Sequence, residues 1–501
     1  MPTAYSIADE ITAPKRGAIE QEGEAMMQPG VIASLSVYFA LMLGIGIYAW
    51  RKSTANSSEY MLSGRQLGPA VTALAAGASD MSGWLMLGLP GALYASGLAE
   101  AWIAIGLFIG ALLNWIIVAP RLREQTERYG NALTIPEFLG NRFNDEKHLL
   151  RLTASIVIIV FFALYSASGL VAGGKLFQSA FGADYQTGLW ITASVVVAYV
   201  VLGGFLAVSL TDFVQGTIMA IALVVVPFMA WQGLPDGVSV TSALNSIDPK
   251  MTSLFAGTTA LGIISTAAWG LGYFGQPHII VRFMAIRSVK EMPIARNICM
   301  VWMAITLSGA LLVGLIGRVY AESKDLTVAD PETIFVLLAG ELFAPVAVGF
   351  LLAAILAAIM STISAQLLVT GSSLTEDVYR LFIRRDASEK EVVTVGRLSV
   401  VAVAAIAMVL AQNPESSVLS LVSNAWAGFG AAFGPVIILA LTWQRMTLAG
   451  AFAGMVTGAL VVIGWIALGW SGAMYEIVPG FLASFATIML VSLATKAARP
   501  A

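Results

Sequence analysis

The sequence has very little of the chemistry that enzymes, metalloproteins and disulfide-linked domains rely on. Its 501 residues include one cysteine, Cys299, and two histidines. A single thiol excludes an internal disulfide framework, and these counts leave no Cys/His cluster for a metal ion. Only 11% of the residues are charged and the formal net charge is −3, so the chain offers no basic surface for a nucleic acid. We therefore expect no enzyme, no organic cofactor and no nucleic-acid partner.

What the sequence has in excess is apolar surface. Hydrophobic residues make up 58% of the chain and its mean hydropathy is +0.82, far above the range of soluble globular proteins. A helix needs about 20 apolar residues to cross the hydrocarbon layer of a bilayer, and stretches of that length recur along the chain. Alternating strands do not fit this spacing, so it predicts an all-α polytopic membrane protein. We predict about thirteen transmembrane helices: 31–50, 68–96, 99–119, 150–177, 186–204, 212–232, 254–277, 294–318, 344–373, 391–412, 417–442, 446–470 and 475–496.

The distribution of lysine and arginine predicts the orientation, because positively charged loops stay on the cytoplasmic side. With an external N-terminus, the loops that would be cytoplasmic hold all but six of the 27 basic residues. An odd number of spans then places the C-terminus inside, whereas twelve or fourteen spans would break the alternation. The six basic residues on the opposite side are Lys15, Arg16, Lys175, Lys250, Arg318 and Lys324.

Spans two and seven are both rich in glycine and both carry helix-breaking residues. Paired interrupted helices in corresponding positions of two halves are typical of transporters with internal repeats. The two spans are five apart, and because five is odd the second copy enters the membrane in the reverse direction. We therefore predict inverted repeats over 68–232 and 254–442. Outside them lie a polar N-terminal tail at 1–30, a peripheral first helix at 31–50 and two peripheral C-terminal helices within 446–496.

Asp80 lies within the second span, in the stretch GASDMSGWLMLGLPG at 77–91. It would lie about 18 Å deep, near the membrane midplane, because each helical residue rises about 1.5 Å. A charge at this depth costs about 2.5 to 3.5 kcal/mol, and such residues usually mark an ion or substrate path. The small residues around Asp80 favour a helix that breaks there and frees backbone carbonyls. The alternative is a kinked helix in which Asp80 bonds to a neighbouring hydroxyl or amide.

The ninth span carries a face of small and hydroxyl-bearing residues, Ala354, Ala358, Ser361 and Thr362, on one side of the predicted helix. Hard cations bind several oxygen ligands, so two hydroxyls on a face with little bulk suit Na⁺. Serine and threonine also join membrane helices through hydrogen bonds. Taken alone, this face fits helix packing better than ion binding.

The seventh span ends in a run of glycines and aromatics, AWGLGYFGQPHIIVRF at 268–283. Flat rings and freed amides suit a cavity for a small organic molecule, which would lie between the glycine-loosened turns. Tryptophan and tyrosine also collect at membrane interfaces, so on sequence alone a cavity and an interface belt stay equally open. We expect His278 and Arg282 to lie on the cytoplasmic surface.

Four further polar residues lie in or beside the predicted spans. Asp212 would cap a helix or line an inner gate, and capping is the favoured interpretation. Tyr165 is a midspan tyrosine that could face the cavity. Glu376 and Asp377 follow the ninth span and are expected to be solvated.

Five stretches of the chain are the most specific pieces of a resemblance that runs over about residues 35–495. They are YMLSGRQLGPAVTALAAGASDMSGWLMLGLPGALYASGLAEAWIAIG (60–106), GLGYFGQPHI (270–279) preceded by Trp269, MSTISAQLL (360–368), TEDVYR (375–380) and WAGFGAAFGPV (426–436). With these stretches the chain resembles the solute:sodium symporter family and follows its proline branch. The resemblance implies a leucine-transporter-like fold with a five-plus-five inverted-repeat core, an external N-terminus and an internal C-terminus, in the bacterial cytoplasmic (inner) membrane. It also implies a secondary transporter that couples Na⁺ influx to L-proline uptake by alternating access.

The resemblance also implies which residues form the site. Asp80, Arg65 and Asp212 match family positions linked to transport and sodium dependence. The implied sodium ligands are the backbone carbonyls of Ala78, Met81 and Ala358 and the hydroxyls of Ser361 and Thr362. The positions assigned to the substrate cavity or its inner gate are Ser82, Gly83, Trp84, Tyr165, Trp269, Tyr273 and Pro277.

Two alternative functions stay open. One is a sodium symporter of the same family for another small solute, such as pantothenate, acetate or a sugar, although Trp269 and Tyr273 within the GYFGQPH run favour proline. The other is a channel or a sensor, for which the sequence offers neither a hydrophilic pore ring nor a kinase-like tail. The chain departs from the family pattern in its long polar tail, in a shorter loop around 320–332 and at Thr370-Gly371, which bears on fine specificity.

Overall fold

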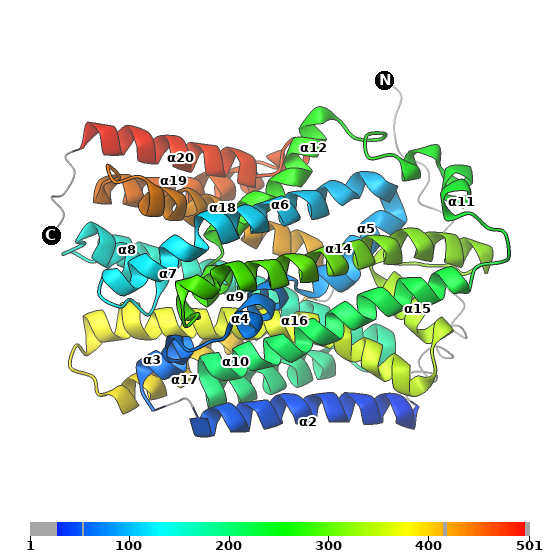
Figure 1. Cartoon of the computed structure of the whole chain (residues 1–501), viewed down its shortest axis with the longest axis horizontal. Helices are drawn as coiled ribbons and strands as arrows, with labels where there is room; N and C mark the ends of the chain where they lie inside the picture. The colour runs from blue at the N-terminus through cyan, green and yellow to red at the C-terminus, as the bar shows by residue number, and fades with distance from the viewer. Residues whose placement is uncertain (1–27, 53–54, 414–417, 496–501) are drawn as a thin grey trace.

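The computed structural model describes residues 28–52, 55–413 and 418–495. This part of the chain is all-helical, and its long helices run side by side along the longest axis of the molecule (Figure 1). The helices are α2 (Pro29–Lys52), α3 (Ser57–Leu62), α4 (Pro69–Asp80), α5 (Leu89–Ser96), α6 (Ala101–Ile117), α7 (Ala119–Arg128), α8 (Ile135–Phe143), α9 (Leu149–Phe181), α10 (Tyr185–Gln232), α11 (Val240–Ile247), α12 (Ala260–Ala267), α13 (Pro277–Ala285), α14 (Met292–Ser323), α15 (Ile334–Leu342), α16 (Pro345–Ser373), α17 (Glu389–Leu410), α18 (Val418–Thr442), α19 (Leu448–Ala467) and α20 (Ile477–Ala494).

The predicted all-α membrane architecture is confirmed. Among the described residues, ten helical stretches are long and apolar enough to cross a membrane. Each of the thirteen predicted spans coincides with a helical segment, because two of the ten stretches contain two spans each and α12 with α13 forms another. The number of spans, the orientation of the termini and the division into repeats remain predictions. The predicted polar tail falls almost entirely on residues 1–27, outside the described part of the chain.

The longest helix, α10, carries two spans because it reverses direction at Gly204. The φ angle of Gly204 is 55°, which a glycine adopts readily. At this reversal, the Tyr60 hydroxyl donates to Val200 O at 3.5 Å, next to the ends of α2 and α3. The first residue of α10, Tyr185, instead donates to Ala411 O at 2.6 Å, at the far end of α17. The first half of α10 therefore crosses the bundle from the end of α17 to the ends of α2 and α3.

Two helices near the centre of the bundle are interrupted, as the sequence predicts. The first consists of α4, the π-helical turn η2 (Trp84–Gly88) and α5, with a break at residues 81–83. The second consists of α12, a 3₁₀ stretch η5 (Ala268–Gly275) and α13. Proline occupies the first position of both α4 and α13, where its fixed φ suits a helix start and its missing N–H costs nothing. α4 packs against α10, α13, α14 and α16, and η5 packs against α6 and α18, so both breaks are enclosed by other helices.

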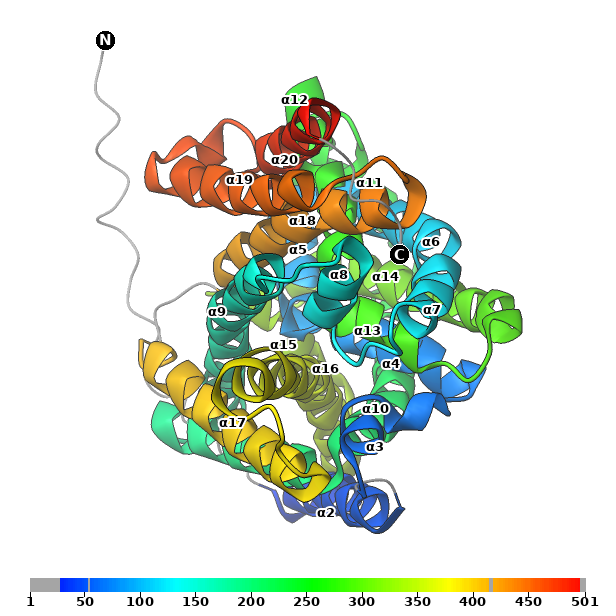
Figure 2. The same cartoon turned by 90° about the vertical axis from the view of Figure 1, so that its left-hand side faces the viewer.

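The remaining helices surround this centre. Viewed along the bundle, α2 lies at one outer side and α19 and α20 at the other (Figure 2). The outward face of α2 exposes apolar side chains such as Val37, which is 68% exposed, because lipid rather than water is the solvent there. The interior is continuous, since one cluster of buried apolar side chains includes residues of every long helix from α2 to α20.

Candidate sodium and substrate site

The first break lies directly after Asp80, the last residue of α4. Met81 leaves the helix with φ −80° and ψ 73°, and the Ser82 amide donates to Asp80 O at 2.9 Å instead of to Ala78 O. The Ala78 carbonyl is thereby released from the helical hydrogen-bond ladder. Asp80 itself is 1% exposed. The small residues around it thus produce the predicted midspan break beside a buried carboxyl group.

Side chains of α16 face the released Ala78 carbonyl. The Ser361 hydroxyl donates to Ala78 O at 2.8 Å and to Ala358 O at 3.1 Å. Thr362 Oγ1 donates to Ala358 O at 3.3 Å, and both hydroxyl-bearing residues are buried. Four of the five predicted sodium ligands therefore meet in one place, and Met81 lies three residues beyond Ala78 in the break. Hydroxyls that rotate can offer lone pairs instead of protons, so this set of oxygens fits a hard monovalent cation.

Asp80 joins the first break to the second. Its Oδ2 accepts a hydrogen bond from the hydroxyl of Tyr273, which lies in η5. Its other oxygen, Oδ1, has no hydrogen-bond partner among the described residues. Asp80 therefore does bond to a hydroxyl, as the alternative interpretation expects. The hydroxyl, however, comes from the other broken helix, so the bond links the two candidate sites.

The second break forms an aromatic wall. Trp269 and Tyr273 are 7% and 3% exposed, which an interface belt does not explain. The Trp84 and Trp269 ring centroids are 6.1 Å apart, so the rings of the two broken helices adjoin. On the other side, the indole nitrogen of Trp426 in α18 donates to Trp269 O at 2.8 Å. Gly272 permits this approach, because a Cβ there would overlap the Trp426 indole.

Other predicted substrate residues lie around these rings. Tyr165 and Ser82 are buried next to each other, and neither hydroxyl has a well-formed hydrogen bond within the described chain. Buried polar groups normally have partners, so these two oxygens are available to a polar ligand. A Cβ on Gly83 would lie 3.0 Å from the Ile359 side chain of α16, so the break approaches α16 closely. Pro277 starts α13 and defines the end of the second break.

Asp212 and Arg282 form a buried ion pair, which contradicts two expectations. Arg282 Nη2 lies 3.0 Å from Asp212 Oδ2, and both side chains are 0% exposed. Asp212 therefore does not cap a helix, since it lies well inside α10. Arg282 and His278, expected on the cytoplasmic surface, are fully buried because α13 runs inside the bundle. Each charge of such a pair depends on the other, since an unpaired buried charge is costly.

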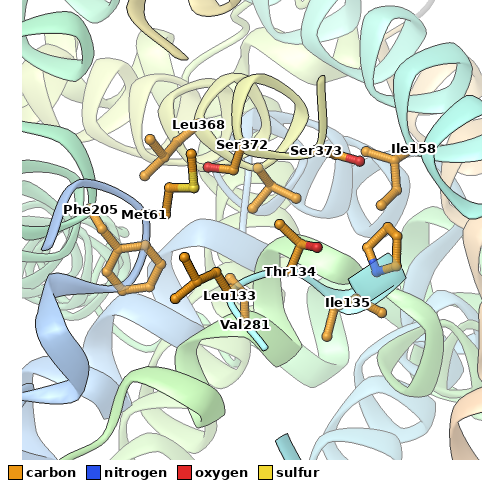
Figure 3. A pocket seen from close by; sticks show the side chains of 12 residues that line it. Met61, Leu133, Thr134, Ile135, Ile158, Phe205, Val281, Leu368, Ser372 and Ser373 are labelled. Atoms are coloured by element: carbon orange, nitrogen blue, oxygen red, sulfur yellow. The ribbon is translucent and has the colours of Figure 1, made fainter. Parts of the chain in front are cut away.

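Asp377 and Glu376 are also buried, so the expectation that they are solvated is wrong. Arg151 Nε lies 2.6 Å from Asp377 Oδ1, and the Thr134 hydroxyl donates to the same oxygen at 2.9 Å. The reason is that α8 and α9 pack over the helical segment that extends α16. A small cavity of about 10 Å³ lies beside this cluster. Figure 3 shows its lining, with Thr134 and Ile135 facing Leu368 and Ser373 of α16.

Arg65 lies away from the other predicted site residues, with the 12 residues of α4 between it and the break. Its guanidinium donates to Met284 O at 2.8 Å and to Ala132 O at 2.7 Å. Burial lowers the pKa of Arg65 to about 10, with Arg123 adding to the effect, so the group stays charged at neutral pH. Beside it, Leu67 forms an isolated bridge with Ile286, which ties the start of α4 to the end of α13.

The fold and the paired breaks define a class of protein, the secondary transporters built around discontinuous helices. Comparison with known sequences narrows the class. The model of the sodium:solute symporter family matches residues 60–458. The chain belongs to this family and is a multi-pass protein of the bacterial cytoplasmic membrane.

The chain is also similar to characterised relatives over nearly its whole length. It is 57% identical to the high-affinity proline transporter PutP of Bacillus subtilis, covering 91% of this chain and 96% of the relative. It is 53% identical to the osmoregulated proline transporter OpuE of the same organism, over 94% and 96% of the two chains. It is 50% identical to a sodium/proline symporter of Staphylococcus aureus, over 96% and 95%.

Two solved structures share the fold. A Na⁺-coupled sialic acid symporter in a substrate-bound outward-open state matches with a TM-score of 0.80 at 18% identity, over 94% of this chain and 99% of that one. A nucleobase-cation-symport-1 family transporter in a closed conformation matches with a TM-score of 0.56 at 12% identity, over 89% and 96%. These likenesses concern the fold, which agrees with the predicted leucine-transporter-like architecture.

Proposed function

We propose that the protein couples Na⁺ influx to the uptake of L-proline by alternating access. The relatives named for proline transport support this substrate, because they are 50% to 57% identical to the chain. The observation that carries the coupling is the meeting of Ser361, Ala78 and Ala358 oxygens beside a carboxyl group that also holds Tyr273. The proposed ion site and the proposed organic site are thus connected through Asp80, which ends the helix that carries Ala78 and accepts the hydrogen bond from Tyr273.

In this proposal Na⁺ binds the carbonyl oxygens of Ala78, Met81 and Ala358 and the hydroxyls of Ser361 and Thr362. Asp80 attracts the ion and holds Tyr273 without having to be a ligand, since the convergent oxygens come from other residues. Asp212 and Arg65 affect sodium dependence indirectly. Asp212 does so through its buried pair with Arg282, and Arg65 does so through its contacts at the start of α4.

L-Proline is proposed to bind between the two breaks. Its apolar ring suits the wall formed by Trp84 and Trp269, whose centroids are 6.1 Å apart. Its charged groups suit the hydroxyls of Ser82 and Tyr165 and the polar backbone freed at the breaks. Gly83, Tyr273 and Pro277 shape the remainder of this cavity.

The driving force suffices for concentrative uptake. A tenfold sodium gradient supplies about 1.4 kcal/mol, and a membrane potential of 100 mV supplies about 2.3 kcal/mol for each charge. One ion for each solute would then support accumulation of roughly 500-fold. The proposal therefore needs no second energy source.

Uptake into membrane vesicles tests the proposal. Labelled proline should accumulate only when a Na⁺ gradient is imposed, and Ser361→Ala should weaken this dependence. Unlabelled pantothenate, acetate and sugars should not compete, whereas unlabelled proline should. Accumulation without a Na⁺ gradient would refute coupling, and competition by another family solute in place of proline would refute the substrate.

A further inference from the structure

A tyrosine from outside the proposed repeats reaches the aromatic wall. Tyr475 precedes α20, which lies with α19 along one edge of the bundle (Figures 1 and 2). Its ring is stacked on Trp269, with centroids 5.4 Å apart and planes 24° apart. Trp269 is also stacked with Trp426 of α18, at 6.3 Å and 27°. The Trp269 ring is therefore stacked on one ring from the proposed repeat and on one ring from the peripheral helices, in addition to adjoining Trp84.

Three hydrogen bonds fix the segment that carries Tyr475. Its hydroxyl donates to Ser423 O of α18 at 2.9 Å, and its backbone N–H donates to Ser265 Oγ of α12 at 3.2 Å. The preceding carbonyl, Met474 O, accepts from the indole of Trp465 in α19 at 2.9 Å. Tyr475 is only 8% exposed, unlike an aromatic residue that anchors a helix at the membrane surface. The ring is thus held in place from three helices.

Trp269 needs such support because its own backbone gives little. It lies in η5, where 3₁₀ geometry replaces the stronger α-helical hydrogen bonds, and glycines follow at positions 270 and 272. An indole on a loosened segment can occupy several orientations unless its neighbours restrict it. The stacked rings of Trp426 in α18 and of Tyr475 before α20 supply that restriction.

We propose that Tyr475 is a positioning residue for the substrate site, which holds the Trp269 indole in the orientation that binds the solute. The inference rests on the proposed function, because it takes Trp269 as part of the cavity wall. It gives the peripheral helices α19 and α20 a role in substrate affinity. An aromatic pair of this kind is worth about a two- to tenfold change in affinity.

The test compares Tyr475→Ala and Tyr475→Phe by Na⁺-driven proline uptake in vesicles, corrected for the amount of protein in the membrane. Tyr475→Ala should raise the KM for proline two- to tenfold, with Vmax and the half-saturating Na⁺ concentration within twofold of the wild type. Tyr475→Phe keeps the stacked ring and should restore the KM to within about twofold. Tyr48→Ala is the matched control, since Tyr48 is 50% exposed on α2 and should leave all three constants unchanged.

A double-mutant cycle adds a readout that general destabilisation would not produce. In a Trp269→Ala background, adding Tyr475→Ala should change the KM by less than twofold, because the pair is already lost. Ser265→Ala, which loosens the Tyr475 backbone and keeps every ring, should have a smaller effect than Tyr475→Ala.

Three results would overturn the inference. They are an unchanged KM in Tyr475→Ala, a loss that appears only in protein amount, or full additivity in the double mutant. A wrong choice of substrate would give a different result, because the wild type would then take up another solute with Na⁺. The same variants are in that case compared by the KM for that solute. A wild type that moves no solute with Na⁺ would overturn both proposals.

Discussion

The two broken helices are both interrupted within the bundle, but the two interruptions differ in length and in chemistry. The first break is three residues long, follows a carboxyl group and releases the Ala78 carbonyl toward the hydroxyls of α16. The second is an eight-residue 3₁₀ stretch without charge, in which glycines alternate with rings. A short break gathers a few oxygens around a point, which suits an ion. A long break presents a surface, which suits an organic solute.

The strongest test of this comparison adds a methyl group to each of the two breaks. Gly272→Ala should destabilise the protein by about 3 kcal/mol or more, because its Cβ would overlap the Trp426 indole. Gly83→Ala should cost less, since its Cβ would lie 3.0 Å from the Ile359 side chain, a contact that a shift of a few tenths of an ångström relieves. Thermal unfolding of the purified variants in detergent gives the measurement.

Gly464→Ala is the control for both variants. A Cβ at Gly464, inside α19, would meet no atom of the described chain within 4 Å. Alanine also favours a helix over glycine, so the variant should be as stable as the wild type or slightly more stable. Equal melting temperatures for Gly272→Ala and Gly464→Ala would show that the second break is not tightly packed.

Ser361→Ala should weaken the binding of Na⁺ and leave the binding of proline nearly unchanged. Losing one buried oxygen from the sodium set should raise the half-saturating Na⁺ concentration tenfold or more, with little change in the proline KM at saturating Na⁺. Thr394→Ala is a matched control, since its hydroxyl bonds Lys390 O of its own helix at 2.7 Å. A proline KM that is raised at every Na⁺ concentration would instead indicate that the ion and the solute share one site.

Tyr273→Phe should uncouple the two breaks. It removes the hydrogen bond to Asp80 and keeps the ring against Trp426, whose centroid is 5.4 Å away. We expect the increase in proline affinity that Na⁺ produces to fall about fivefold, which corresponds to a coupling free energy of about 1 kcal/mol. Proline binding measured across a series of Na⁺ concentrations checks this, and an unchanged Na⁺ effect would place the coupling elsewhere.

Arg65→Lys should have the smallest effect, because it lies far from both breaks. Lysine keeps the charge but loses the fork that reaches Met284 O and Ala132 O at once. We expect Vmax to change two- to threefold while the Na⁺ and proline constants stay near the wild-type values. A change in Na⁺ affinity as large as that of Ser361→Ala would make Arg65 part of the ion site.

Local composition predicted both breaks and the hydroxyl face of α16, and it left the aromatic run open between a cavity wall and an interface belt. These features depend on neighbours in sequence, such as the small residues beside Asp80 and the glycines between Trp269 and Tyr273. The buried pair of Asp212 with Arg282 was missed because its members are 70 positions apart and the loop-charge rule treated Arg282 as cytoplasmic. Asp377 and Tyr475 were missed for the same reason, since their partners lie on other helices.

The bridge between Leu67 and Ile286 limits how often the start of α4 separates from the end of α13. Leu67 N donates to Ala285 O at 3.1 Å, and Arg287 N donates to Leu67 O at 3.0 Å. Two backbone bonds that water can replace are worth about 1 to 3 kcal/mol together, which is a bias of about 5- to 150-fold. The Arg65 guanidinium, which donates to Met284 O beside this bridge, adds to the bias, so a form in which the two segments separate would be a minor population. The protein would reach this separated form by thermal motion alone. Binding of the ion or the solute would then change only the fraction of molecules that adopt it.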